Sequence, residues 1–246
     1  MIKSFFFCTL LFCFSFCFAQ KSKAKLTETS VVRDSSGMVY PYAFWKQMLL
    51  SGKYKSRALY PENENSDFLI VPLSDDEIET MMKTLPKPRT SQVFRDGAKF
   101  PGFTETDING NKYKIKDLLG KVIVINFWFI NCPPCRTEIP ELNGLVKMYE
   151  NNKHVVFIGI AMDDKYRLKE FLKTSPFYYN IIENGGYLAK QYNVQNFPTH
   201  VVIDGEGKVR LHTIGLARNT VYWINKTIKE SLSGIPATGI TTKMAN

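Results

Sequence analysis

Residues 122–129 are apolar at nearly every position. A strand with one face in water alternates polar and apolar residues, so an unbroken apolar run is typical of a central strand that is covered on both faces. The next segment carries Ile139, Leu142 and Leu145 at the spacing of an amphipathic helix. A buried strand that leads into such a helix predicts a βαβ unit with a right-handed crossover.

The alternation of strands and helices extends over residues 96–233. Two β-rich runs flank residues 204–207, whose sequence Asp-Gly-Glu-Gly is typical of a hairpin turn. Parallel strands followed by an antiparallel hairpin and a closing helix predict an α/β fold, with a mixed central sheet flanked by helices. Further strands are expected at 154–161, 178–182, 199–203 and 208–214, and helices at 164–173, 186–192 and 221–228.

Residues 20–95 are predicted to form a separate N-terminal extension of unknown role. A helix is expected near residues 44–50, and a strand at the apolar run 68–71. Ser74 stands three residues before Glu77 in a capping-box arrangement, which predicts a second helix. Residues 84–90, with two prolines and two basic residues, are expected to be a linker. At the other end, residues 234–246 are expected to be a C-terminal tail.

The first 19 residues have the pattern of an export signal. Lys3 gives a positive start, residues 5–18 are almost all apolar, and Ala19 is a small residue before Gln20. The apolar run is shorter than the roughly 20 residues that a membrane-spanning helix needs. A cleaved signal peptide at residues 1–19 is therefore expected, and with it a location in the periplasm or cell envelope. An uncleaved anchor and a lipoprotein are the alternatives.

Three of the five cysteines, Cys8, Cys13 and Cys17, lie in that first segment. Its removal leaves Cys132 and Cys135, which are separated by two residues. A bridge that closes so small a loop removes little entropy from the unfolded chain, so the pair is a poor structural staple and is well placed to react. Half of a zinc site is the alternative. It lacks a second pair of ligands, because the histidines are far apart and fit strand positions: His154, His200 and His212.

Cys132 follows the buried strand and opens the helix. Unpaired backbone N–H groups and the positive end of the helix dipole favour a thiolate there, which makes Cys132 the expected nucleophile. Cys135 lies three residues later on the same helix face and is the expected resolving thiol. Pro133 and Pro134 fit the first helical turn but remove N–H donors. The activation of Cys132 should therefore be moderate, which favours a reductase over a strong oxidant.

Glu138 stands three positions after Cys135 on the same expected helix face. It is placed to accept the proton that the resolving thiol must lose. An ordinary acidic residue stabilised in the first turns of a helix would occupy the same position. From the residues alone, both interpretations stay open.

The net charge of +9 comes from basic residues that are scattered along the chain. No basic cluster of the kind that binds nucleic acid stands out. Lys21, Lys23 and Lys25 form a short basic start to the chain that remains after signal cleavage. A solvated tail is the simpler interpretation, and proximity to a membrane surface is the alternative.

Residues 127–142 read Phe-Trp-Phe-Ile-Asn-Cys-Pro-Pro-Cys-Arg-Thr-Glu-Ile-Pro-Glu-Leu. This segment resembles the active-site segment of the thioredoxin superfamily, in particular its exported TlpA-like branch. Residues 97–121 are similar to the strand-turn-strand region of that branch, and residues 194–207 to its proline loop and hairpin. The resemblance covers residues 96–232 and implies a thioredoxin-like domain at 96–233.

The resemblance also implies how the cysteines work. Cys132 and Cys135 would alternate between dithiol and disulfide, with no other cofactor and no metal. Glu138 would be an active-site acid, since family members carry a glutamate at this position. Classical thioredoxins have a buried aspartate on the preceding strand, where this chain has Asn126, which cannot titrate.

A second set of implied roles concerns substrate binding. The Phe197–Pro198 bond would be cis, which would leave the backbone of Phe197 free to pair with an extended substrate. Asn131 replaces the tryptophan that most relatives have before the nucleophile, and is expected to cap the helix. The expected substrate-binding residues are Trp128, Asn131, Phe197, Pro198 and Thr199.

The implied reaction is thiol-disulfide exchange, in which Cys132 attacks a substrate disulfide and Cys135 resolves the mixed disulfide. In relatives the targets include apocytochrome c and other disulfide-bearing envelope proteins, and the electrons come from a membrane thiol transporter. Two alternatives are a thiol peroxidase, and a binding or chaperone module that uses the same fold without turnover.

Overall fold

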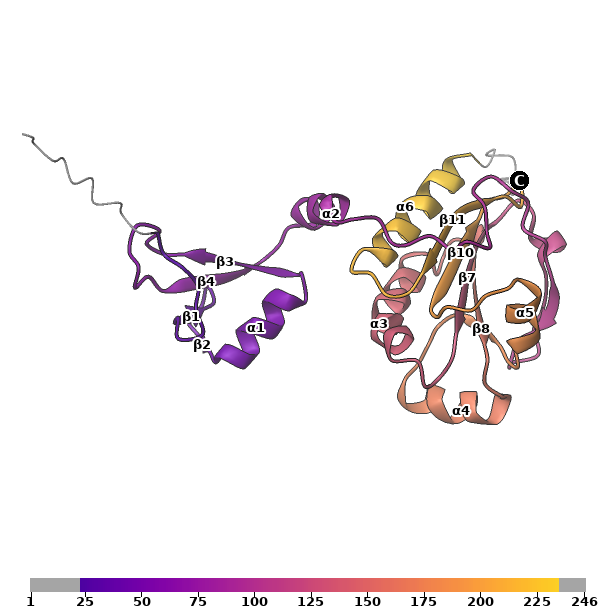
Figure 1. Cartoon of the computed structure of the whole chain (residues 1–246), viewed down its shortest axis with the longest axis horizontal. Helices are drawn as coiled ribbons and strands as arrows, with labels where there is room; N and C mark the ends of the chain where they lie inside the picture. The colour runs from indigo at the N-terminus through magenta and orange to yellow at the C-terminus, as the bar shows by residue number, and fades with distance from the viewer. Residues whose placement is uncertain (1–22, 235–246) are drawn as a thin grey trace, which may run out of the picture. The chain divides into compact units, whose positions relative to one another are not determined.

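The structure is a computed structural model that describes residues 23–234 and divides into two compact units, Met1–Ile78 and Glu79–Asn246 (Figure 1). The expected signal peptide at residues 1–19, with its three cysteines, lies outside the described residues. Residues 235–246 of the expected tail lie outside them as well. Within residues 23–234, no helix is both long enough and apolar enough to cross a membrane.

The N-terminal unit is a small sheet with one helix packed against it. The strand order is β2-β1-β4-β3, with β1 parallel to β4 and the other neighbours antiparallel. Its elements are β1 (Val32–Arg33), β2 (Val39–Tyr40), α1 (Tyr42–Leu50), β3 (Tyr54–Ala58) and β4 (Phe68–Pro72). The buried side chains of its core are Val32, Trp45, Phe68 and Ile70. The expected helix near 44–50 and strand at 68–71 are both present.

Helix α2 (Asp75–Thr84) begins with the capping box that the sequence indicates. The backbone N–H of Glu77 donates to Ser74 Oγ over 3.3 Å, and the N–H of Ser74 donates to Glu77 Oε2 over 3.1 Å. Two N–H groups that the helix itself leaves unpaired are thereby satisfied.

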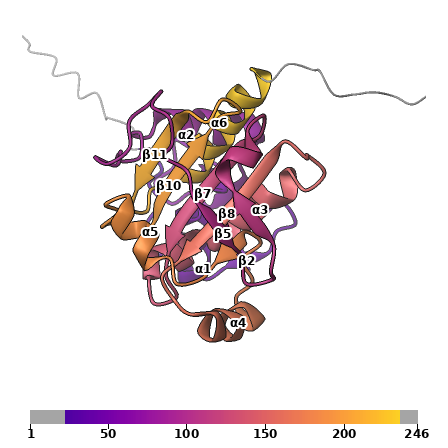
Figure 2. The ribbon, with the colours of Figure 1, turned by 90° about the vertical axis from the view of Figure 1, so that its right-hand side faces the viewer.

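The C-terminal unit is built on a five-stranded mixed sheet of order β11-β10-β7-β8-β9. Figure 2 shows β11, β10, β7 and β8 side by side in this order. Strands β7, β8 and β9 are parallel, whereas β10 is antiparallel to both β7 and β11. The strands are β7 (Val122–Trp128), β8 (Val155–Ala161), β9 (Asn180–Ile182), β10 (Thr199–Ile203) and β11 (Val209–Ile214). The predicted α/β class and mixed sheet are confirmed.

Helices cover both faces of this sheet, which explains why β7 is buried along its whole length (Figure 1). The residues of α3, α4 and α6 share one core with one face, and those of α5 share a second core with the other. The helices are α3 (Pro133–Met148), α4 (Lys165–Thr174), α5 (Gly186–Gln191) and α6 (Thr220–Ser233). A hairpin of β5 (Thr104–Thr106) and β6 (Lys112–Lys114), followed by the 3₁₀ helix η1 (Ile115–Leu118), precedes β7.

The two units divide between Ile78 and Glu79, earlier than the change of pattern near residue 95 suggests. Residues 79–95 belong to the C-terminal unit because they make specific contacts with it. The buried Asn219 amide donates to the carbonyl oxygens of Met82 and Pro86, each over 3.1 Å. Phe94 is a buried member of the core on the α5 face.

Candidate functional site

The cysteine pair lies at the start of α3, in the segment that follows β7. Cys132 is the N-cap of α3, and its Sγ accepts a hydrogen bond from the backbone N–H of Cys135 over 3.3 Å. Since Pro133 and Pro134 have no N–H, this is the first donor that the helix offers. A negative charge on Cys132 Sγ in the reduced protein would meet that N–H and the positive end of the helix dipole.

The expectation that Asn131 caps α3 is wrong. Asn131 is exposed, and the cap position belongs to Cys132, whose backbone is extended at φ −97° and ψ 101°. The helix therefore starts one residue later than a typical asparagine cap would require.

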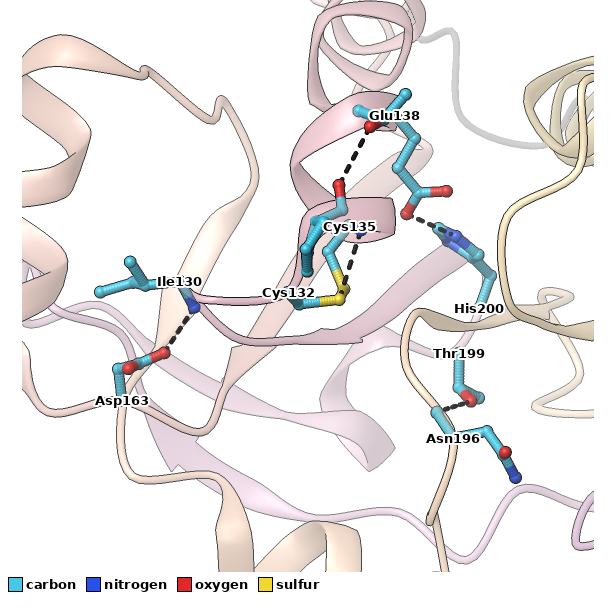
Figure 3. Close-up of a disulfide and its surroundings, with 10 residues drawn as sticks. Ile130, Cys132, Cys135, Glu138, Asp163, Asn196, Thr199 and His200 are labelled. Atoms are coloured by element: carbon cyan, nitrogen blue, oxygen red, sulfur yellow. Dashed lines mark hydrogen bonds and ion pairs between the residues drawn. A yellow bond between two sulfur atoms is a disulfide. The ribbon is translucent and has the colours of Figure 1, made fainter.

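The structure joins Cys132 and Cys135 by a disulfide, with 5.3 Å between the two Cα atoms (Figure 3). Both residues are buried in this state, with relative exposures of 2% and 1%. Because the bridge closes a loop of one helical turn, it adds little to stability. Its position favours reactivity instead.

Asp163, which follows β8, binds the backbone of the loop between β7 and Cys132. Asp163 Oδ2 accepts the backbone N–H of Ile130 over 2.7 Å (Figure 3). The other carboxylate oxygen, Oδ1, lies 3.0 Å from Arg167 Nη1. Asp163 is itself buried, so this bond is shielded from water and fixes the backbone two residues before the nucleophile.

Replacing Asp163 by alanine should destabilise the protein by about 1–3 kcal/mol, because it leaves the Ile130 N–H without its acceptor. Disulfide-exchange activity should fall as well, since Cys132 loses its fixed position. Arg167→Ala is the matched control: it removes a half-exposed ion pair and should cost less than about 1 kcal/mol. Urea unfolding of both variants measures the difference, and equal losses would contradict the role given to the Ile130 bond.

The proline loop lies on the other side of the cysteines. The Phe197–Pro198 peptide bond is cis. The half-buried Phe197 ring packs edge-on against Phe129, with 5.3 Å between the ring centroids. Thr199 Oγ1 donates to the carbonyl oxygen of Asn196 over 2.6 Å, which closes the loop on itself. The loops before α3 and before β10 therefore meet through an aromatic pair.

Three residues of the expected substrate-binding set are buried, namely Trp128, Pro198 and Thr199. Trp128 has no exposed surface, and its indole packs edge-on against Phe177 at 5.3 Å. The side chain of Thr199 is likewise buried. Asn131 and Phe197 keep some exposure, so they remain in position to contact a partner.

Gly159 makes room for Trp128 behind the site. A methyl group at this glycine would lie 3.2 Å from Trp128 Nε1 and 2.7 Å from Ile181 Cδ1. Only a residue without a side chain leaves room at this position for both the indole and the Ile181 side chain.

Glu138 is buried on the inner side of α3, one turn after Cys135. Its Oε1 atom lies 2.9 Å from Nε2 of His200, which projects from β10 (Figure 3). The side chains are 2% and 0% exposed. Sequence reasoning assigned His200 only as a strand residue, so it missed this pair. The strand periodicity could have indicated that His200 is buried. Successive side chains of a strand point to opposite faces, so His200 lies on the same face as the apolar Val202.

Tyr179 is a further titratable group on this side of the sheet. Burial, and secondarily the charge of Glu138, holds the pKa of Tyr179 well above its ordinary value. The phenol therefore stays protonated at physiological pH.

The remaining histidines are not part of the site. His212 lies on β11 with its Nε2 atom 3.5 Å from Asp96, and His154 is exposed just before β8. Within residues 23–234, no group of three or more His, Cys, Asp or Glu side chains is arranged to hold a metal ion.

Comparison with known proteins decides the family. The profile of the AhpC/TSA family matches residues 97–212. A thiol-disulfide oxidoreductase ResA from Bacillus cereus strain ZK is 36% identical over 121 residues, which are 48% of this chain and 69% of that protein. The chain belongs to the ResA-type family of thioredoxin-like thiol-disulfide oxidoreductases.

A second ResA, from Bacillus thuringiensis subspecies konkukian, is 36% identical over 115 residues, which are 46% of this chain and 66% of that protein. The chain thus spans about two thirds of the length of these ResA proteins. Among solved structures, a protein of Chlorobium tepidum named as a thiol:disulfide interchange protein of DsbE type superimposes with a TM-score of 0.52. That protein is 26% identical, and the match covers 56% of this chain and 99% of that one.

The range matched by the AhpC/TSA family profile includes every residue of the site. Cys132, Cys135, Glu138 and His200 all lie within the matched range 97–212, as does Asp163. The N-terminal unit lies outside it, so the family assignment applies to the C-terminal unit.

Proposed function

We propose that this chain reduces disulfide bonds of other proteins through its Cys132–Cys135 pair. One observation carries the proposal: the two sulfur atoms form a disulfide at the N-terminus of α3, with the buried Glu138 one turn away. A structural disulfide needs no neighbouring proton acceptor, whereas an exchanging pair does.

In the first step, the thiolate of Cys132 attacks one sulfur of the substrate disulfide. The substrate bond breaks, its other sulfur leaves as a thiolate that takes a proton from water, and a mixed disulfide joins Cys132 to the substrate. The Cys135 N–H and the helix dipole stabilise the attacking charge beforehand. The Phe129–Phe197 pair and the exposed Asn131 would form the surface that the substrate meets.

In the second step, Cys135 gives its thiol proton to Glu138 and attacks Cys132 Sγ. The Cys132–Cys135 bond forms, the mixed disulfide breaks, and the second substrate sulfur leaves as a thiolate that takes a proton from water. Two electrons have passed from the protein to the substrate. The protein is then oxidised and needs a thiol donor to reduce it again.

The exported setting follows from the N-terminal pattern at residues 1–19, which supports a location in the periplasm or cell envelope. In that setting the substrates would be disulfide-bearing envelope proteins, with apocytochrome c as one candidate. A membrane thiol transporter would be the electron donor, and no cofactor beyond the disulfide is required.

The reduction potential of the Cys132–Cys135 pair tests the proposal. A reduction potential of about −270 mV, as in thioredoxin, is expected for a reductase, whereas a potential of about −120 mV would indicate an oxidant. Equilibration with glutathione or dithiothreitol buffers gives this number. Peroxide consumption is measured in parallel. Turnover of peroxide without reduction of protein disulfides would replace the proposal by the peroxidase alternative, and absence of any redox couple would favour the binding module.

A further inference from the structure

His200 and Glu138 come from elements that are distant in sequence, yet they meet in the interior. His200 is the second residue of β10, and Glu138 lies in the second turn of α3. Their contact of 2.9 Å is not aligned as an ideal hydrogen bond. Within residues 23–234, neither carboxylate oxygen of Glu138 and neither ring nitrogen of His200 has another hydrogen-bond partner.

Two more buried polar groups stand beside His200. In the sheet register His200 faces Asn126 on β7 and Thr213 on β11. Side chains that are directly opposite in an antiparallel ladder lie on the same face, so the three form a polar row on the face of the sheet that α3 and α6 cover. The side-chain amide of Asn126 and Oγ1 of Thr213 also have no hydrogen-bond partner within the described residues.

Such a cluster is costly in a hydrophobic core. Buried polar groups without partners destabilise the folded state, and a buried ion pair is commonly no more stabilising than apolar residues of similar size. Glu138 lies one turn after Cys135 on α3, and the core on this face of the sheet, to which Cys135 belongs, is built from apolar residues. Its cost therefore points to a role in the reaction.

We propose that His200 is a positioning residue that makes Glu138 and His200 a single proton-accepting pair for Cys135. This inference rests on the proposed function and names the partner of its proton acceptor. The contact with Nε2 holds the Glu138 carboxylate in place, one helical turn after the resolving thiol of Cys135.

The proton balance is simple. During resolution the thiol proton of Cys135 passes to the pair as the Cys135 thiolate displaces the substrate sulfur from Cys132. The departing substrate sulfur takes a proton from solvent, and the pair releases its own proton once the Cys132–Cys135 bond has formed. The net change is one dithiol oxidised and one substrate disulfide reduced.

The groups that face the pair are few. From α3 it faces Cys135, and from the segment before β9 it faces Tyr179, whose pKa is raised by burial and by Glu138. The neighbours on β7 and β11, Asn126 and Thr213, do not titrate. Tyr179 holds its proton and cannot accept one, which leaves Glu138 and His200 to do so.

Stopped-flow reduction of dithiobis(nitrobenzoate) separates the two steps, because Cys132 releases the first coloured thiol and Cys135 the second. In His200→Gln we expect the second phase to slow by about tenfold to hundredfold, with a changed pH profile and a first phase within about twofold of wild type. His212→Gln, a buried histidine on the opposite face of the same sheet, is the matched control and should keep both rates.

A double variant completes the test. If the two residues act as one pair, Glu138→Gln with His200→Gln should be no slower than Glu138→Gln alone. Fully additive losses, or a wild-type second phase and pH profile in His200→Gln, would overturn the inference. A wild-type protein that releases no second thiol would instead contradict the proposed function.

A second measurement does not depend on the variants of His200. The imidazole nitrogen signals of His200 are followed by NMR in oxidised and reduced wild-type protein. They should differ between the two states and shift in Glu138→Gln. Identical signals in all three samples would also overturn the inference.

Discussion

A Cys132→Ser protein should show no dithiol-dependent reduction of a protein disulfide above the rate of the free dithiol. A serine hydroxyl is neither ionised at neutral pH nor able to form a disulfide, so the first step has no nucleophile. Cys135→Ser should keep the first step and stop at the second, because nothing resolves the mixed disulfide. Insulin reduction followed by turbidity, with non-reducing gels of the quenched reaction, measures both outcomes.

Thr137→Ser serves as the control for changes at the start of α3, since Thr137 is exposed and its hydroxyl bond to the Pro133 carbonyl can be kept by serine. This variant should behave as wild type. Activity in both cysteine variants, or trapped substrate in Cys132→Ser and none in Cys135→Ser, would reverse or remove the assigned roles.

The second large effect is expected for Glu138→Gln. The amide has the same shape as the acid but cannot take a proton, so the resolving step should slow by about hundredfold, whereas attack by Cys132 should change little. Mixed disulfide should therefore accumulate during turnover. Rapid acid quench and mass spectrometry give the amount of this intermediate as a function of time.

Glu141→Gln is a close control, since it places the same substitution on an exposed position of the same helix. It should leave the resolving rate unchanged. A Glu138→Gln protein that resolves its mixed disulfide at the wild-type rate would mean that water takes the proton of Cys135 directly and that Glu138 has only a structural part.

Much of the C-terminal unit could be predicted because its signals are local. The apolar run at 122–129 corresponds to β7, and the turn at 204–207 joins β10 to β11. The cysteine pair stands out because its two residues are close in sequence and are the only cysteines in residues 23–234. Periodicity and spacing of this kind depend on neighbours along the chain, so no knowledge of tertiary contacts is needed.

The features that were missed depend on contacts between distant segments. His200 reaches Glu138 only because β10 enters the sheet beside β7, and Asp163 reaches Ile130 only because β8 lies on the other side. The prediction that Asn131 caps α3 failed for a local reason. Asn131 has the better side chain for capping in general, but here the turn leaves it in solvent and places a sulfur at the cap.

The contacts of residues 79–95 affect how this chain can be divided for experiments. A fragment that starts at residue 96 would lose Phe94 from the core and the carbonyl partners of Asn219. It would also lose the carbonyl of Arg89, which accepts the N–H of Ile214 over 2.8 Å at the end of β11. If such a fragment folded poorly, its lost activity would be wrongly assigned to the N-terminal extension. The cut therefore belongs before Ser74, which also keeps α2 and its capping box intact.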